Sequence, residues 1–189
     1  MAEEEPGIGK TIKDGLIAVI KGSGEVADAV VDTVSGTLVN TLRGTRAVGT
    51  ELSGLIIDGV RGAIKGTSEV GGDLGAAAKN AVIGALRGTK DVGSEASGLV
   101  RDSAKGVVQG TAEVGGDVAG AAKGAIEGAV IAAKDIGLTA EEAASAAATG
   151  ALEAAGNVSA EAAKRVRDGL KETIAGVKVV LKEPFSKEE

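Results

Sequence analysis

The chain repeats itself every 22 residues along nearly its whole length. Cut from Lys10 onward, it divides into eight aligned copies that end at Phe185, with no insertion or deletion. A representative line of the alignment is Lys65-Gly66-Thr67-Ser68-Glu69-Val70. A fixed period of this kind means that one structural unit is reused. Because 22 is twice eleven, and eleven residues make three turns of an α-helix, the period predicts an all-α protein.

The apolar residues recur at helical spacing. When each copy is numbered 1 to 22 from Lys10, they occupy positions 3, 7, 11, 17 and mostly 21, with Thr common at position 14. Steps of three and four residues place these positions on one face of an amphipathic helix. We therefore predict an apolar interface face. It is made of Leu16, Ile20, Val26, Leu38, Leu42, Val48, Val60, Ile64, Val70, Val82, Leu86, Val92, Val108, Val114, Ile126, Val130 and Ile136.

Glycine is concentrated at positions 9 and 13 of the copies. Each glycine in a helix interior costs roughly 0.8–1 kcal/mol relative to alanine, so a lone helix of this sequence should be largely unfolded in water. We expect a neighbouring surface, protein or lipid, to shelter the apolar face. Strips of small residues let helix backbones approach closely, which predicts a close-packing strip. It comprises Gly44, Gly62, Gly66, Gly84, Gly88, Gly106, Gly110 and Gly128.

The sequence leaves two arrangements of the helices open. A Val-Gly-x-acid motif, as in Val70–Asp73, could end one helix and cap the next, which would give a solenoid of short helices. The unbroken eleven-residue phase favours long, continuous, amphipathic Gly/Ala-rich helices, hairpinned or stacked in an assembly. Breaks are expected near 137–139, where Thr139 and Glu142 form a capping box, and near 156–159.

Most of the net charge of −6 comes from the two ends of the chain. We expect an acidic tail at residues 1–9, the repeats at 10–185, and a charged tail at 186–189. Within the repeats, basic and acidic residues fall on opposite flanks of the helix, so neighbouring helices could pair charges. The lack of a basic stripe argues against a nucleic-acid partner. With no signal peptide and no apolar run near the ~20 residues of a spanning helix, we expect a cytoplasmic protein, which could lie at an internal lipid or membrane surface.

Catalytic chemistry has little material to work with. The chain contains no His, Cys or Tyr, and its carboxylates recur at helical spacing beside cations, as solvated charges do. Gly9-Lys10-Thr11 resembles the end of a phosphate-binding loop, but Glu4 stands where that loop requires glycine. We therefore predict no enzyme, no cofactor, no metal site and no small-molecule substrate.

The stretch Gly98–Asp117, which reads GLVRDSAKGVVQGTAEVGGD, resembles the eleven-residue repeats of perilipins and synucleins. The resemblance covers Lys10 to Phe185 and lies in general character, namely Gly, Thr, Val and Ala with alternating Lys and Asp, and not in a unique motif. It implies a chain that becomes helical on a lipid droplet or membrane. Late-embryogenesis proteins and some helical antifreeze proteins also use eleven-residue periods. The chain departs from synucleins by lacking a net basic, lipid-facing half, and it is less hydrophilic than late-embryogenesis proteins.

These observations support three functions. The first is a non-enzymatic structural protein that self-assembles through the apolar face and the glycine strip into a homo-oligomer, tube or filament. The second is a lipid-droplet or membrane-surface coat protein. The third is a stress-protective chain like the late-embryogenesis proteins, which 43% hydrophobic residues disfavour.

Overall fold

A computed structural model describes residues 7–23, 26–44, 50–91, 95–171, 174 and 176–179. This part of the chain is all-helical, with eight α-helices, one short 3-10 helix and one isolated bridge between Ile174 and Val177. The elements are α1 (Ile8–Ser23), α2 (Val26–Gly44), α3 (Thr50–Glu69), α4 (Leu74–Thr89), α5 (Ala96–Glu113), α6 (Val118–Ala132), η1 (Ala133–Ile136), α7 (Ala140–Val158) and α8 (Ala160–Gly169).

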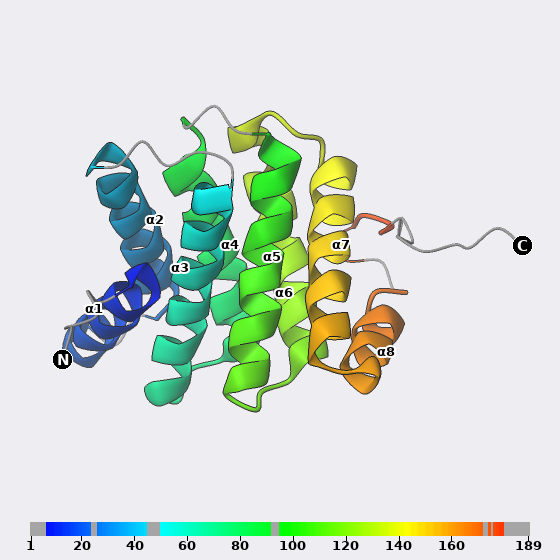
Figure 1. The fold of residues 1–189 in the computed structure, drawn as a ribbon, viewed down its shortest axis with the longest axis horizontal. Coiled ribbons are helices and arrows are strands. Elements are labelled where there is room, and N and C mark those ends of the chain that lie inside the picture. The colour runs from blue at the N-terminus through cyan, green and yellow to red at the C-terminus, as the bar shows by residue number, and fades with distance from the viewer. Residues whose placement is uncertain are drawn as a thin grey trace, which may run out of the picture.

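The helices form a two-layered stack (Figure 1). One layer holds α1, α3, α5 and α7, and the other holds α2, α4, α6 and α8. The most extensive contacts join helices that are two apart in sequence, such as α4 with α6 and α5 with α7. Consecutive helices from α1 to α7 pack less extensively, across the space between the layers, whereas α8 packs more on α7 than on α6. The chain therefore crosses from one layer to the other at each turn, and each layer grows by one helix every second turn.

Glycines in the left-handed conformation end three of these helices. Gly71, Gly115 and Gly137 have φ angles of 71°, 70° and 76°. After α3, the Gly71 N–H donates to Ser68 O (3.1 Å) and the next residue's N–H donates to Thr67 O (2.9 Å). Equivalent pairs of bonds follow α5 and η1. This is the Schellman motif, which satisfies the last carbonyls of a helix and turns the chain away.

Side-chain caps then start the next helices. Asp73 and Asp117 accept hydrogen bonds from the N–H groups of Ala76 and Ala119, at 2.6 and 3.1 Å, and so cap α4 and α6. Such caps satisfy N–H groups that have no partner within the helix. A Val-Gly-Gly-Asp segment thus contains both a stop and a start signal.

The expectation of long, continuous helices is therefore wrong, and the short-helix alternative describes the structure. The described helices span 10 to 20 residues. The eleven-residue phase survives because the turns between helices keep the repeat length constant: α4, α5, α6 and α7 begin 22 residues apart. An unbroken phase is therefore compatible with two structures: one long helix, or short helices whose combined length of helix and turn is constant.

The structure has helix ends at both sites where the sequence indicated breaks. Gly137 lies between η1 and α7, and Thr139 and Glu142 form the reciprocal capping box at the start of α7. Ser159 separates α7 from α8, and its side chain accepts a hydrogen bond from the Ala162 N–H at 3.0 Å. The motif instances that include Val48 and Val92 lie partly outside the described residues.

The expected tail boundary at residue 9 differs from the structure. Helix α1 begins at Ile8, so residues 8 and 9 belong to the first helix. Residues 1–6 and 186–189 lie outside the described part of the chain.

The core is a continuous, thin zone of small and aliphatic side chains between the two layers of helices. Its buried members extend from Ile8 in α1 to Val177 after α8, and alanine is the commonest among them. The largest fully buried side chains include Leu16, Ile56 and Ile126. Because so many members are alanines, the layers lie close together without aromatic residues.

Replacing Gly115 with alanine tests the turn that separates α5 from α6. The left-handed conformation disfavours any residue with a Cβ atom, so Gly115→Ala should lower the free energy of unfolding by about 1–2 kcal/mol. The control is Gly156→Ala, because Gly156 lies in α7 and a Cβ atom added there would meet nothing within 4 Å. This control should raise stability by up to about 1 kcal/mol. Urea denaturation followed by circular dichroism measures both, and equal effects would contradict the assignment.

Candidate functional site

The predicted apolar face lines the core between the layers. Eight of its members are fully buried: Leu16, Leu38, Val60, Ile64, Val82, Leu86, Val108 and Ile126. Seven are half-buried: Ile20, Val26, Leu42, Val70, Val114, Val130 and Ile136. Val48 and Val92 lie outside the described residues. The expectation that another chain or a lipid must shelter this face is therefore wrong, because the chain's own second layer covers it.

The glycine strip lies at the contacts between helices of the same layer. Seven of its eight members are buried there: Gly62, Gly66, Gly84, Gly88, Gly106, Gly110 and Gly128. A Cβ atom added to Gly84 would lie 2.7 Å from Val31 O, and one added to Gly106 would lie 2.7 Å from Ile57 O. The strip thus brings the backbone of one helix against the backbone of the helix two before it. We call each such contact a seam.

The seams also involve glycines that the predicted strip left out. Gly124 and Gly150 meet backbone atoms of Gly75 and Arg101 in the preceding helix of their layer, and Gly62 meets Gly9. The regular occurrence of glycine at position 9 was the signal that could have identified Gly150. No pattern in a single copy identifies Gly9 or Gly75, because their role depends on a helix about 50 residues away.

Ion pairs run along the same seams. Lys13 of α1 bonds Glu69 of α3 (2.8 Å), and Lys105 of α5 bonds Glu153 of α7 (2.8 Å). In each case the earlier helix supplies the cation and the later helix supplies the carboxylate. Glu113 receives both Arg61 and Lys65 from α3. The opposite charged flanks of the sequence thus face one another within each layer.

Gly44 behaves differently from the rest of the strip. It is exposed, and a Cβ atom added to it would meet nothing within 4 Å. The reason is its place in the stack: α2 is the first helix of its layer, so no earlier helix lies against its glycine side. The same holds for α1 in the other layer (Figure 1).

Because α1 and α2 are the first helices of their layers, one side of each is uncovered. The helices from α3 to α7 bury the corresponding side against the preceding helix of their layer. We define the end face as positions 2, 6, 9 and 13 of these two helices. Its described members are Thr11, Gly15 and Ala18 of α1, and Thr33, Thr37, Asn40 and Gly44 of α2. Thr11, Ala18, Asn40 and Gly44 are exposed, and the other three are half-buried. In α3 to α7 all residues at these positions are buried, except half-buried Leu55.

The end face has no charged member, and its residues are small. Stacked-repeat proteins generally need a polar outer face on their terminal repeats to stay soluble. The end face has polar members in Thr11, Thr33, Thr37 and Asn40, but it carries no charge of its own. Lys10 and Asp14 lie beside it on α1 and form their own ion pair (2.7 Å). Its chemistry suits close approach of another surface. The sequence carried one signal for it, since position 9 is glycine in five later copies but Ala18 and Asn40 in the first two.

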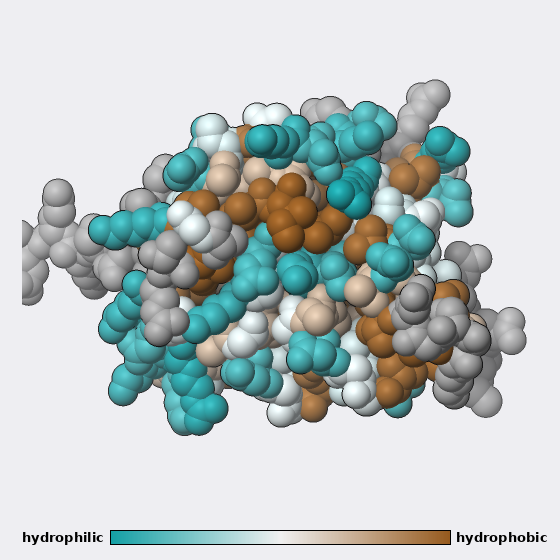
Figure 2. Space-filling view, turned by 180° about the vertical axis from the view of Figure 1, so that it is seen from behind, coloured by the Kyte–Doolittle hydropathy of each residue, from teal (hydrophilic) through white to brown (hydrophobic). Residues whose placement is uncertain are grey.

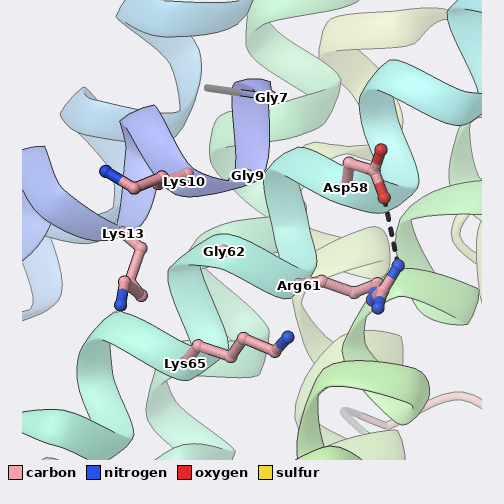
Figure 3. A pocket seen from close by; sticks show the side chains of 8 residues that line it. All are labelled: Gly7, Gly9, Lys10, Lys13, Asp58, Arg61, Gly62 and Lys65. Atoms are coloured by element: carbon pink, nitrogen blue, oxygen red, sulfur yellow. Dashed lines mark hydrogen bonds and ion pairs between the residues drawn. The ribbon is translucent and has the colours of Figure 1, made fainter. Parts of the chain in front are cut away.

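A cavity of about 340 Å³ lies between the start of α1 and the middle of α3 (Figure 3). Lys10, Lys13, Arg61 and Lys65 line it, together with Asp58. Each of the four cations forms an ion pair with a carboxylate: Lys10 with Asp14, Lys13 with Glu69, Arg61 with Asp58 and Glu113, and Lys65 with Glu113. Because these charges balance, the cavity offers no net attraction to an anionic ligand.

Among the described residues, no group of three or more acidic residues could hold a metal ion. Within the same part of the chain, no helix is both long and apolar enough to cross a bilayer. Its exposed large apolar residues, Val19, Ile131 and Val158, lie on three different helices. Figure 2 shows hydrophobic patches, the widest near the middle of the view, bordered by hydrophilic residues on the back of the stack.

No protein family, curated protein or solved structure matches this chain.

The seams can be tested by adding one methyl group. Gly106→Ala would place its Cβ atom 2.7 Å from Ile57 O and 2.9 Å from Val60 Cβ, so α3 and α5 must separate. We expect a loss of about 1–3 kcal/mol in the free energy of unfolding. Gly54→Ala is the matched control, because Gly54 also lies within a helix but has open space around it. It should stabilise the protein by up to about 1 kcal/mol. Stabilisation by both variants in urea denaturation would show that the seams are not close contacts.

The ion pairs of Glu113 predict a pH dependence. Partial burial opposes ionisation of Glu113, but hydrogen bonds from Lys65 and Arg61 outweigh it and lower the pKa of the carboxyl below 4.5. A lowered pKa in the folded state stabilises the protein above pH 4.5, and this contribution disappears as the pH falls through the folded-state value. Because the pair is partly solvent-screened, Glu113→Gln should cost about 0.5–1 kcal/mol at neutral pH. Urea denaturation from neutral to acidic pH should show the difference shrinking; a difference independent of pH would contradict the pairing.

Proposed function

We propose that this protein is a non-enzymatic structural protein that self-associates, and that copies meet through the end face of α1 and α2. The observation that carries the proposal is the exposure of Ala18, Asn40 and Gly44, the described residues at positions 9 and 13 of these helices. The same positions are buried against a neighbouring helix in every described helix from α3 to α7. The end face is the side of the molecule where stacking has no further helix of this chain to use.

A second copy of the chain fits the chemistry of this surface. The end face is uncharged and is built from Thr, Gly, Ala and Asn side chains, which let two helix backbones approach closely. Surfaces of this kind recur in the chain at each seam, where glycine meets backbone. Small residues and close backbone contact are therefore the means by which this sequence joins helices. The cavity beside α1 lies at a charge-balanced site, which gives a small anionic ligand no comparable support.

A lipid coat would require the apolar face to turn outward. In the structure that face lines the core, and the exposed large apolar residues are scattered over three helices. Adsorption to lipid through the predicted residues would need the two layers to separate. No observation in the described residues favours that alternative, so self-association is the function that we carry forward.

Two glutamates placed on the end face should stop the association. Ala18→Glu combined with Asn40→Glu adds a bulky charge to the exposed side of α1 and of α2. Burying these charges without a partner is costly, so the variant should be monomeric at concentrations where the native chain is oligomeric. Sedimentation velocity over a concentration series measures the change.

The matched control carries the same two changes elsewhere. Ala76→Glu with Asn157→Glu alters one exposed alanine and one exposed asparagine, on α4 and α7. The control should associate like the native chain, and all three proteins should have the same helical circular dichroism. A native chain that sediments as a monomer throughout, or a control that dissociates equally, would refute the proposal.

A further inference from the structure

We propose that two copies pair about a two-fold axis, with α2 of one copy lying antiparallel to α2 of the other and Gly36 at the axis. This inference rests on the proposed function and specifies how the partner copy sits. It commits to a closed dimer, in contrast to an open-ended filament.

Helix α2 carries a ridge of exposed residues. The residues Asp28, Asp32, Gly36, Asn40 and Gly44 follow one another at intervals of four, and all five are exposed. Residues four apart lie along one ridge of a helix surface, and packing two such ridges against each other is the commonest helix-packing class. Asn40 and Gly44 of this ridge belong to the end face, so the ridge and the end face form one surface.

The centre of the ridge permits close contact. Gly36 lies near the middle of α2, and a Cβ atom added there would meet nothing within 4 Å. A glycine at this place costs helix stability without serving any contact inside the described chain. At a two-fold axis, Gly36 of each copy would face its own counterpart and let the two backbones approach.

The ridge itself carries two carboxylates and no cation, but Arg43 lies next to its Gly44 end, so the two ends complement each other when the ridge is reversed. Asp28 and Asp32 lie on one side of Gly36, and Asn40 and Arg43 lie on the other. An antiparallel partner places Asp32 of one copy opposite Asn40 of the other, and Asp28 of one copy beside Arg43 of the other. The two-fold axis forms each of these contacts twice. Asp28, Asp32 and Arg43 form no ion pair among the described residues, although cations and carboxylates pair along the seams. Their charges are therefore available to a partner.

The other end of the stack explains why the pairing is two-fold. After α8, the chain makes a tight turn in which Ile174 and Val177 exchange backbone hydrogen bonds of 3.0 and 2.9 Å. Both side chains are buried in the core. In Figure 1 this segment lies beside α7, on the side away from α5, where a further helix of that layer would stack. With that side occupied, the end face of one copy has the end face of another as its fitting partner.

A charge exchange between copies tests this arrangement directly. Arg43→Glu alone would set the new glutamate against Asp28 at both contacts, and Asp28→Arg alone would set two cations together. Each single variant should dissociate about tenfold more readily than the native dimer, since two attractions are replaced by two repulsions at once. An equimolar mixture of the two variants restores an opposite-charge pair at both contacts. The mixture should therefore dimerise with a dissociation constant near that of the native chain.

Sedimentation equilibrium of the native chain, each variant and the mixture separates the possible failures. A mixture no tighter than the single variants, or a native chain that grows beyond a dimer, overturns the two-fold arrangement while leaving self-association in place. A monomeric native chain overturns both proposals.

A second pair of variants tests the axis without relying on charge pairs. Gly36→Lys should abolish the dimer, because two lysines would meet where the backbones approach. Gly54→Lys is its control, since Gly54 is also an exposed helical glycine with no atom within 4 Å of an added Cβ atom. Both variants should remain folded by circular dichroism. A Gly36→Lys protein that still dimerises as tightly as the control overturns the placement of the axis.

Discussion

Everything in this stack depends on helix backbones coming into direct contact at glycine. Where Gly84 meets Val31 and Gly106 meets Ile57, a single methyl group would have no room. Each glycine weakens its own helix, and the loss is offset because close approach adds van der Waals contact between two helices and brings their oppositely charged flanks together. The seams fix the spacing within each layer, and the layers in turn enclose a thin core that alanine can fill. The absence of aromatic bulk from that core follows from this spacing.

Much of the local structure could be predicted from the sequence. The helical period, the apolar face and the capping box of Thr139 with Glu142 each depend on residues within one or two turns of each other. The residues that form the apolar face could also be predicted, but the surface that covers this face could not. Leu16 and Leu86 look the same in sequence whether they are covered by a second layer, another chain or a lipid. Seam partners such as Lys105 and Glu153 are 48 residues apart, and no single copy of the repeat contains both.

The mistaken expectation of continuous helices has a specific physical origin. A helical phase that persists through Val70–Asp73 indicates continuity only if the chain does not turn there. Gly71, in the left-handed conformation, turns the chain, and Asp73, four residues after α3 ends at Glu69, caps the next helix. Because the same stop and start recur, the phase is reset by a constant amount. The end face was missed for a related reason: a surface that matters because a neighbour is lacking can be recognised only once the order of stacking is known.

This chain shelters its own apolar face through glycine seams, before any partner is involved. The most direct test is far-ultraviolet circular dichroism of the purified protein without lipid, diluted to the lowest concentration that gives a signal, with urea denaturation at that concentration. A chain that folds through its own seams remains helical on dilution and unfolds in one cooperative transition. A chain that loses its helicity on dilution, and regains it only at high concentration or on lipid, would show that the seams do not hold the stack together.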